Sequence, residues 1–456
     1  MSPHVQAGHD LEAAAERVAS WARSGEEVEV YVARALETDV RAYAGEVESL
    51  TSATSAGVGV RVVADHRQGF AWAGSLEEAV LAETLAAARD NAGFAVPDEH
   101  LALAVPDGVP PVAVDLFDPS LAQVPTADKV ALALDLEARA RGAHPAVRQV
   151  SSADYGDVVV ETALVSTTGV RATGRRTSAY ASVSVIAGDG DASQTGTGFT
   201  VGRSYDVLDP EAAAVEAVER AVRMLGAAKG GSGRMTVVFD RRVTSTLLGA
   251  LAAALSGEAA AKGRSFFADR LGEQVAEASV TLVDDPTDVR AYGAAVYDGE
   301  GLACRRNVLV DGGVLREFLY DTVTARRVGA RPNGAAVRGG YAGLPGPGCR
   351  ALVLSGGSED LDEPGVLATV GEGLYVQSVT GVHSGVSPVS GDVSVGAEGL
   401  RIRDGHLAEP VREVTVASTF QRMLRSMVAV GADLAFLPGV AAGQTVAVAD
   451  MQVSGT

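Results

Sequence analysis

The chain has 456 residues, of which 47% are apolar and 53 are glycine, so it is long enough for two or three domains around a large core. Its 38 basic and 58 acidic residues give a net charge of −20, which argues against nucleic acid and against an anionic membrane surface as partners, because both bind through basic patches. No apolar run approaches the roughly 20 residues of a membrane-spanning helix.

The N-terminal segment, residues 1–105, is predicted to form an α+β domain. It begins without the basic and apolar segments of a secretory signal, and the chain has only two cysteines, so we expect a protein of the reducing cytoplasm. Apolar residues recur at helical spacing in residues 11–22 and 76–92, and strand-like runs lie between these helices. Strands are expected at residues 28–32, 40–43, 57–63 and 69–72. This order predicts an α/β sandwich-like region in which helices cover one face of a sheet.

A connection rich in proline and aspartate, residues 103–125, separates this domain from a middle α+β domain at residues 106–230. Helices are expected at residues 126–141 and 210–225. Strands are expected at residues 150–155, 158–166, 175–187 and 194–202. A Gly-rich stretch at the end of this domain marks the second boundary, and an ordinary loop within one domain is the alternative.

Residues 231–456 are predicted to form a large strand-rich domain. Helical periodicity indicates two helices, at residues 243–255 and 418–429. Strands are expected at residues 235–239, 279–283, 305–310, 314–320, 351–354, 373–378, 399–403 and 411–416. The fold class predicted for the whole chain is therefore α+β.

A search for catalytic and metal-binding motifs finds none that is complete. None of the seven histidines stands in an HExxH or HxxxH pair, the spacing of helical zinc sites, and Cys304 and Cys349 have no neighbour at CxxC spacing. The chain also lacks a GxSxG elbow and a phosphate-binding loop. His383 lies near Ser387 and Asp392, but closeness in sequence does not position a triad.

Two pairs of carboxylates, Asp284 with Asp285 and Asp298 with Glu300, have the residue types that bind cations or transfer protons. Aspartates more often cap turns, because their carboxylates accept hydrogen bonds from the backbone that follows. We therefore interpret both pairs as turn residues. From the residues alone we predict no catalytic residue, no metal ligand and no cofactor in this chain.

Several sequence blocks resemble the TldD/PmbA peptidase family in their residues, order and spacing. In the C-terminal half they are LSGEA at 255–259, KGRSF at 262–266, LVDDP at 282–286, DGEG at 298–301, RRNVL at 305–309, GVL at 313–315, SPVSGD at 387–392 and VAVGAD at 428–433. Near the N-terminus they are EVESL at 46–50 and GVGVR at 57–61. The resemblance thus extends over nearly the whole chain.

The family that the chain resembles has two arms, which differ in one helix. The TldD arm carries an HExxxH zinc helix, and the TldE (PmbA) arm lacks it and pairs with the first. Here Leu248, Gly249 and Ala253 occupy the positions of the first His, the Glu and the second His, and no cysteine follows Cys349 to match a further ligand of the TldD arm. The resemblance implies a TldE-type subunit without zinc, in a heterodimer with a zinc-bearing TldD-type subunit.

The resemblance also implies a role for such a subunit. Inert alone, it would complete a closed chamber in which the pair cleaves unfolded or extended peptides. The helix around Leu248 is expected to face the chamber or the partner, with plain core packing as the alternative. His383, Ser387 and Asp392 are candidates for lining the chamber, with a surface loop as the alternative. Ser387 and Ser390 stand where family members usually carry Asn and Thr, a change that could alter substrate preference.

Two other functions stay open at this stage. The pair could act as an amide hydrolase on a small peptide-like natural product. Alternatively, the chain could be a stand-alone, homodimeric binding or scaffold protein. Interfaces of obligate pairs are large and apolar, so an isolated subunit could also form a homodimer through the surface that its partner would cover.

Overall fold

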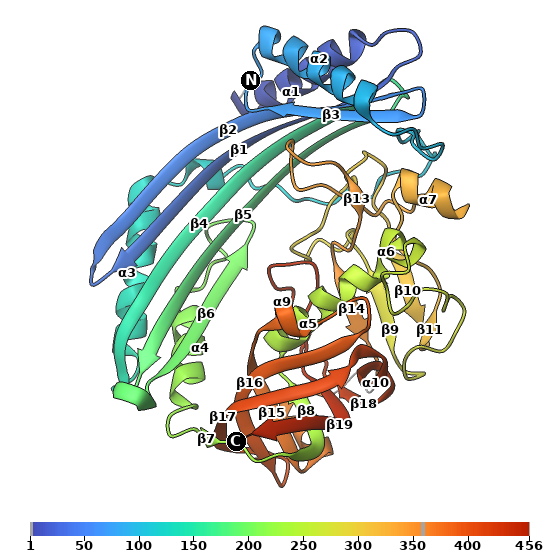
Figure 1. Ribbon diagram of the computed structural model, residues 1–456. Coiled ribbons are helices and arrows are strands. Elements are labelled where there is room, and N and C mark those ends of the chain that lie inside the picture. The colour runs from blue at the N-terminus through green and yellow to red at the C-terminus, as the bar shows by residue number, and fades with distance from the viewer. Residues whose placement is uncertain (1–2, 357–360, 456) are drawn as a thin grey trace.

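The computed structural model describes residues 3–356 and 361–455, and one six-stranded sheet dominates its N-terminal half. Its strands, in sheet order, are β3 (Arg67–Ala73), β2 (Glu46–Ala64), β1 (Glu27–Tyr43), β4 (Val147–Ser166), β5 (Arg171–Ala187) and β6 (Gln194–Gly202). All neighbours are antiparallel, and the sheet arches over the C-terminal region (Figure 1). The first two predicted domains therefore share one sheet through the β1–β4 pairing, and the boundary near residue 105 stays a prediction.

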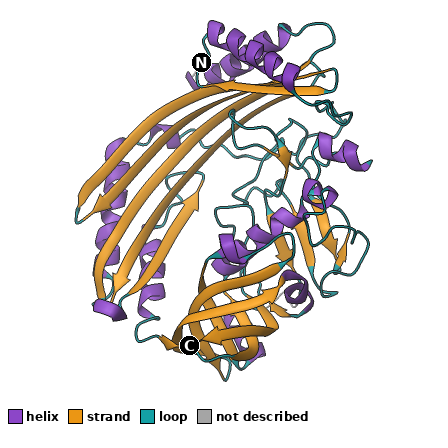
Figure 2. Ribbon diagram, viewed as in Figure 1, coloured by secondary structure: helices purple, strands orange, loops and turns teal. Residues whose placement is uncertain are grey.

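Four helices cover the convex face of this sheet (Figure 2). They are α1 (Pro3–Ser20), α2 (Glu78–Phe94), α3 (Thr126–Gly142) and α4 (Pro210–Val222). Alternate strand residues point to opposite faces, and Val28, Val30 and Val32 of β1 are buried in one cluster with residues of α1 and α2. Val40 and Ala42, on the same face of β1, are buried with residues of α3 and α4. The prediction that helices cover one sheet face is therefore confirmed.

The concave face is covered only near the beginning of β1. There, Leu302 from the C-terminal region packs against Tyr31 and Leu164. Further along β5, the inward-facing residues are polar and only partly buried or exposed, in contrast to their buried neighbours on the convex side. These inward residues are Ser178, Tyr180, Ser182 and Ser184. The concave face is thus polar along this part of β5.

The C-terminal region is built around a closed ring of five strands, because β17 pairs with β19 in addition to its neighbours. In ring order these strands are β19 (Val446–Gly455), β8 (Gly233–Phe239), β15 (Gly373–Thr380), β16 (Asp392–Arg403) and β17 (His406–Thr419). Two short strands, β7 (Ala228–Lys229) and β18 (Met427–Val430), flank the ring. A large apolar core packs against it, with α5 (Arg241–Ala252) among its elements.

Smaller elements fill the space between the ring and the large sheet. A four-stranded sheet contains β11 (Val314–Leu315), β10 (Asn307–Asp311), β9 (Thr281–Asp284) and β14 (Leu352–Ser355), and a two-stranded one contains β12 (Ala336–Val337) and β13 (Gly346–Pro347). The remaining helices are α6 (Gly257–Ala261), α7 (Thr322–Val328), α8 (Glu363–Val370), α9 (Val382–Gly385) and α10 (Phe420–Arg425), and the short 3-10 helices are η1 (Leu121–Gln123), η2 (Gly190–Ala192) and η3 (Ala253–Leu255). No helix in the described ranges is long and apolar enough to cross a membrane.

The predicted α+β class is confirmed, but one predicted helix is wrong. Residues 418–429 divide into the end of β17, the short helix α10 and the strand β18. The side chain of Thr419 caps α10 by accepting a hydrogen bond from the N–H of Arg422 at 3.3 Å. Beyond this helix, Met427 pairs with Val448 of β19. Strand pairing with a distant segment therefore overrides the local helical pattern.

Candidate functional site

The helix α5 and the start of η3 carry Leu248, Gly249 and Ala253, the three positions where the resemblance predicts a lost zinc motif. Helix α5 begins at Asp240, whose Oδ1 accepts a hydrogen bond from the N–H of Val243 at 2.7 Å. Leu248 is 6% exposed and belongs to the large apolar core, Gly249 is half-buried, and Ala253 is exposed in η3. These side chains offer no nitrogen, oxygen or sulfur donor, so the positions do not fit a zinc ion.

Leu248 also lines a small apolar hollow of about 30 Å³ beside Phe420 and Met427. The alternatives for this helix are a position facing a chamber or partner and plain core packing. Leu248 has the environment of core packing, whereas the exposed Ala253 does not. That the helix faces a chamber or a partner stays a prediction. Elsewhere within residues 3–356 and 361–455, no group of three or more His, Cys, Asp or Glu side chains has an arrangement that could hold a metal.

His383 lies on α9, Ser387 on the loop that follows, and Asp392 is the first residue of β16. Ser387 and Asp392 meet through the backbone, since the N–H of Ser387 donates to the Asp392 carbonyl at 2.9 Å. The Asp392 carboxylate accepts a hydrogen bond from the Ser390 hydroxyl at 2.6 Å. His383 is exposed and, in the described part of the chain, forms no hydrogen bond with Ser387 or Asp392. Ser387, Ser390 and Asp392 therefore form a turn that His383 precedes in the chain. The role of His383, Ser387 and Asp392 in lining a chamber stays a prediction.

Asp298 caps the turn that follows it, as predicted, whereas the carboxylate of Asp284 binds backbone far away in the chain, so its interpretation as a turn residue is wrong. Oδ1 of Asp298 accepts hydrogen bonds from the N–H groups of Glu300 and Leu302, both at 2.9 Å. Oδ1 of Asp284 accepts from the N–H groups of Arg350 and Ala351, at 2.8 and 2.7 Å. Burial raises the pKa of each of the two carboxyls to about 6, although the backbone donors partly counteract this shift.

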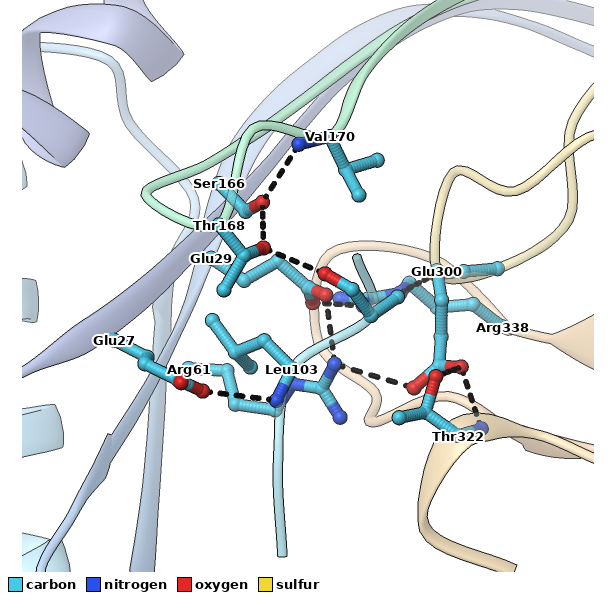
Figure 3. Close-up of polar contacts among 12 residues, drawn as sticks. Glu27, Glu29, Arg61, Leu103, Ser166, Thr168, Val170, Glu300, Thr322 and Arg338 are labelled. Atoms are coloured by element: carbon cyan, nitrogen blue, oxygen red, sulfur yellow. Dashed lines mark hydrogen bonds and ion pairs between the residues drawn. The ribbon is translucent and has the colours of Figure 1, made fainter. Parts of the chain in front are cut away.

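Sequence reasoning missed a buried ion-pair network that joins the large sheet to the C-terminal region (Figure 3). Nη2 of Arg61, on β2, lies 2.7 Å from Oε2 of Glu29 on β1 and 3.3 Å from Oε1 of Glu300. Arg338 pairs with the other oxygen of Glu29, and its guanidinium stacks on the Tyr31 ring at 4.8 Å. The four charged side chains are 3% exposed or less, so two arginines and two glutamates neutralise one another away from water.

The two glutamates of this network differ in their pKa. Glu29 is flanked by Arg61 and Arg338, and these charges hold its pKa below the usual value despite the opposing effect of burial. Burial raises the pKa of Glu300 to about 7, and the negative charges of Asp298 and Asp321 act in the same direction. The charge of Arg61 opposes this shift without cancelling it. The other oxygen of Glu300 accepts hydrogen bonds from the hydroxyl and the N–H of Thr322, at 2.7 and 2.8 Å.

A pocket of about 360 Å³ lies beside this network, between the concave sheet face and the C-terminal loops. Strands β1, β4 and β5 form one wall, and residues 114–117 and 294–299 form the others. Its charged lining residues are Arg175, Arg176, Arg338, Arg350, Asp115 and Asp298. Ligand pockets in proteins begin at about this volume, so the pocket is large enough for a short peptide segment.

Comparisons with known proteins match nearly the whole chain. Residues 28–92 match PmbA/TldA metallopeptidase domain 1, residues 119–225 the central domain and residues 232–455 the C-terminal domain. Metalloprotease PmbA of Escherichia coli O157:H7 is 26% identical over 94% of this chain and 92% of its own length. A metalloprotease TldD homolog of Haemophilus influenzae is 29% identical over 86% of this chain and 83% of its own length.

The fold is also that of a solved structure. The crystal structure of TldE from Thermococcus kodakarensis superposes with a TM-score of 0.87 at 20% identity, covering 98% of this chain and 99% of that one. The three successive domain matches, in the same order along the chain, cover both the large sheet and the five-stranded ring. This chain therefore belongs to the PmbA/TldD metallopeptidase family.

Proposed function

We propose that this chain is the non-catalytic, TldE/PmbA-type subunit of a two-subunit metallopeptidase of the cytoplasm. In this proposal a TldD-type subunit supplies the zinc, and the pair cleaves unfolded or extended peptides. The observation that carries the proposal is the chemistry of α5 and η3, where Leu248, Gly249 and Ala253 have no group that could ligate zinc or move a proton. Relatives of both the PmbA and the TldD type support a division of labour between two chains.

The large sheet supports a role as the wall of a peptide-binding chamber. Its concave face is polar over most of β5, and it faces the ring of the C-terminal region (Figure 1). In the described part of the chain, β3 pairs with residues 58–64 of β2. The outer edge of β2 from residue 46 to residue 57 therefore has no neighbouring strand there. Extended peptides bind to such edges by adding a strand, whose backbone hydrogen bonds do not depend on the peptide's sequence.

The proposal is tested by measuring zinc content and casein cleavage for this chain alone, for a TldD-type subunit from the same source, and for their mixture. We expect the chain alone to be free of zinc and inactive, and the mixture to be active. Removing zinc from the partner with a chelator should abolish the activity of the mixture. Stoichiometric zinc and casein cleavage by this chain alone would refute the proposal.

The role of the sheet is tested by a matched pair of substitutions. Tyr180 on the concave face is 38% exposed, and Val215 on the helix α4 is 40% exposed. Tyr180→Lys should lower casein cleavage by the mixture without preventing complex formation, because it adds a long charged side chain to the peptide-facing wall. Val215→Lys should leave cleavage unchanged. Equal activity of both variants would argue against the sheet as a substrate wall.

A further inference from the structure

The pocket beside the ion-pair network is lined by more positively than negatively charged side chains. Four arginines and two aspartates line it, in a protein with 38 basic and 58 acidic residues. The carboxylate of Asp298 is occupied by three backbone N–H groups, of Glu300, Leu302 and Ala336. A positively charged pocket in so acidic a protein favours an anionic ligand.

Three of the four arginines, Arg175, Arg176 and Arg350, form no ion pair within the described ranges. The guanidinium of Arg175 stacks on the Phe117 ring at 4.4 Å. Arg176, on the concave face of β5, forms neither an ion pair nor a side-chain hydrogen bond in these ranges. The guanidinium of Arg350 makes one hydrogen bond, from Nη2 to the Ala336 carbonyl at 3.1 Å, and its buried Nε has no acceptor. Arg338, in contrast, is committed to Glu29 and to the Gly299 carbonyl. The charge of Arg350 also acts on Asp284 and Asp298 and lowers their pKa against the effect of burial. Arg176 and Arg350 thus keep guanidinium donors that a ligand could use.

A further arginine adds to the positive field. Arg203 is close enough to Arg176 that, together with burial, the like charge lowers its pKa below the ordinary value. Among the described residues, its guanidinium donates hydrogen bonds to the carbonyls of Val289 and Ala291, at 3.5 and 2.9 Å. An anion between Arg176 and Arg350 would offset this repulsion, because opposite charge stabilises the protonated arginines.

The pocket also borders an unpaired strand edge. Strand β6 pairs with β5 from Ala179 onward, so no strand of the described part of the chain pairs with residues 171–178 of β5 on that side. In the described chain, the backbone contact to this edge is the hydrogen bond from the Thr177 N–H to the Leu116 carbonyl at 2.9 Å. Apolar side chains of Val160, Leu164 and Val296 complete the lining. An apolar surface next to a free edge suits a short extended peptide better than a small inorganic anion.

We propose that this pocket binds the C-terminal carboxylate of a peptide between Arg176 and Arg350, with the last peptide residues lying along the free edge of β5. A guanidinium binds a carboxylate through two parallel N–H donors, which fixes the orientation of the chain end. The inference rests on the proposed peptidase function, and it assigns this subunit a site that recognises one end of the substrate or product.

The test is calorimetric titration of the full chain, without partner, with N-acetyl-Ala-Val as the free acid, as its C-terminal amide, and with inorganic phosphate. We expect the acid to bind at least tenfold more tightly than the amide and than phosphate. Equal binding of acid and amide would overturn the proposal, and so would phosphate binding as tight as that of the acid, which would indicate a simple anion site.

Variants locate the site. Arg176→Gln and Arg350→Gln should each abolish the preference for the acid, and Arg176→Lys should retain part of it. Arg331→Gln is the control, since Arg331 is exposed and does not line the pocket. Arg176 is itself exposed on a strand, so its variants should fold, which thermal unfolding verifies. An undiminished acid preference in Arg176→Gln would refute the assignment.

The same preparations separate this proposal from the proposed function. If the mixture with a TldD-type subunit cleaves casein but acid and amide bind alike, the carboxylate site alone is wrong. If the acid is preferred but the mixture is inactive and zinc-free, the peptidase function is wrong and the pocket remains a carboxylate site.

Discussion

Two groups of arginines lie on the concave side of the large sheet, and they differ in their partners. Arg61 and Arg338 are buried against Glu29 and Glu300, with distances as short as 2.7 Å between Arg61 and Glu29. In the adjoining pocket, Arg176 has no carboxylate partner in the described ranges. Arginine thus has two uses on this side of the sheet. Paired arginines hold the sheet to the C-terminal region, and unpaired arginines are available to a ligand.

The energetic consequences of the two groups differ as well. When one charge of a buried ion pair is removed, the remaining charge is left uncompensated in a medium that solvates it poorly. An exposed charge without a partner is solvated by water, so its removal changes stability little. Substitutions in the two groups should therefore give large and small effects on unfolding, respectively.

The largest expected effect is that of Arg61→Met. This change leaves Glu29 with Arg338 alone and Glu300 with no arginine, and it should lower the free energy of unfolding by about 3–5 kcal/mol. Urea unfolding followed by tryptophan fluorescence measures it, because both tryptophans, Trp21 and Trp72, lie in the N-terminal part. Arg17→Met is the control, since Arg17 and its partner Glu78 are 52% and 69% exposed. Equal effects of the two changes would contradict the structural role of the network.

The next expected effect is a dependence of stability on pH. The folded protein raises the pKa of Glu300 from 4.5 to about 7, so between these values it holds a proton that the unfolded chain releases. The free energy of unfolding therefore decreases as the pH rises from 4.5 to 7 and levels off above 7, by at most roughly 3 kcal/mol from this group.

Glu300→Gln should weaken this dependence between pH 6 and 7, most clearly in the upper half of that interval. The pKa of Asp284 and Asp298 is raised to about 6, so their contributions to the slope are already halved at pH 6 and fade toward pH 7, where Glu300 still titrates. Urea unfolding at pH 6.0, 6.5 and 7.0 compares the two proteins. An identical slope in wild type and variant would show that Glu300 does not titrate in this range.

Arg338→Met should have a smaller effect than Arg61→Met. Glu29 keeps the ion pair with Arg61, and the substitution removes one charge-assisted contact and the stacking on Tyr31. We expect a loss of about 1.5–3 kcal/mol in the same unfolding experiment. A loss as large as that of Arg61→Met would show that the remaining ion pair with Arg61 does not compensate Glu29.

The smallest expected effect is that of Arg176→Gln. The side chain has no partner to lose in the described part of the protein, and its removal relieves the repulsion of Arg203. The free energy of unfolding should change by less than about 0.5 kcal/mol. A destabilisation of several kcal/mol would reveal a structural role for Arg176 and would break the comparison.

Much of the fold follows from local patterns in the sequence. The helical period of residues 11–22 and the alternation in residues 57–63 predict the elements that became α1 and β2. Strand β19 was missed because Asp450 adopts a left-handed conformation, with φ of +56°, where the pairing with β8 shifts between Val448 and Met451. That irregularity interrupts the alternation by which a strand is recognised in sequence.

The ion-pair network could not be predicted in the same way. Arg61 is the one charged residue within the apolar run 58–63, which marks it as unusual, but its partner Glu300 is 239 residues away in the chain. Similarly, Asp298 and Glu300 were interpreted together as turn residues. Only Asp298 uses its carboxylate in the turn, whereas that of Glu300 reaches across to β2. Local spacing predicts turns and caps, but not which distant charge a buried residue meets.

The division of labour between two subunits is tested most directly by native mass spectrometry of this chain, a TldD-type subunit and their mixture, with zinc counted in each species. The account predicts a zinc-free species for this chain alone and a mixed complex of one copy of each, whose zinc stays with the TldD-type subunit when the complex is dissociated. Zinc retained by this chain after dissociation, or the absence of any mixed complex, would contradict it.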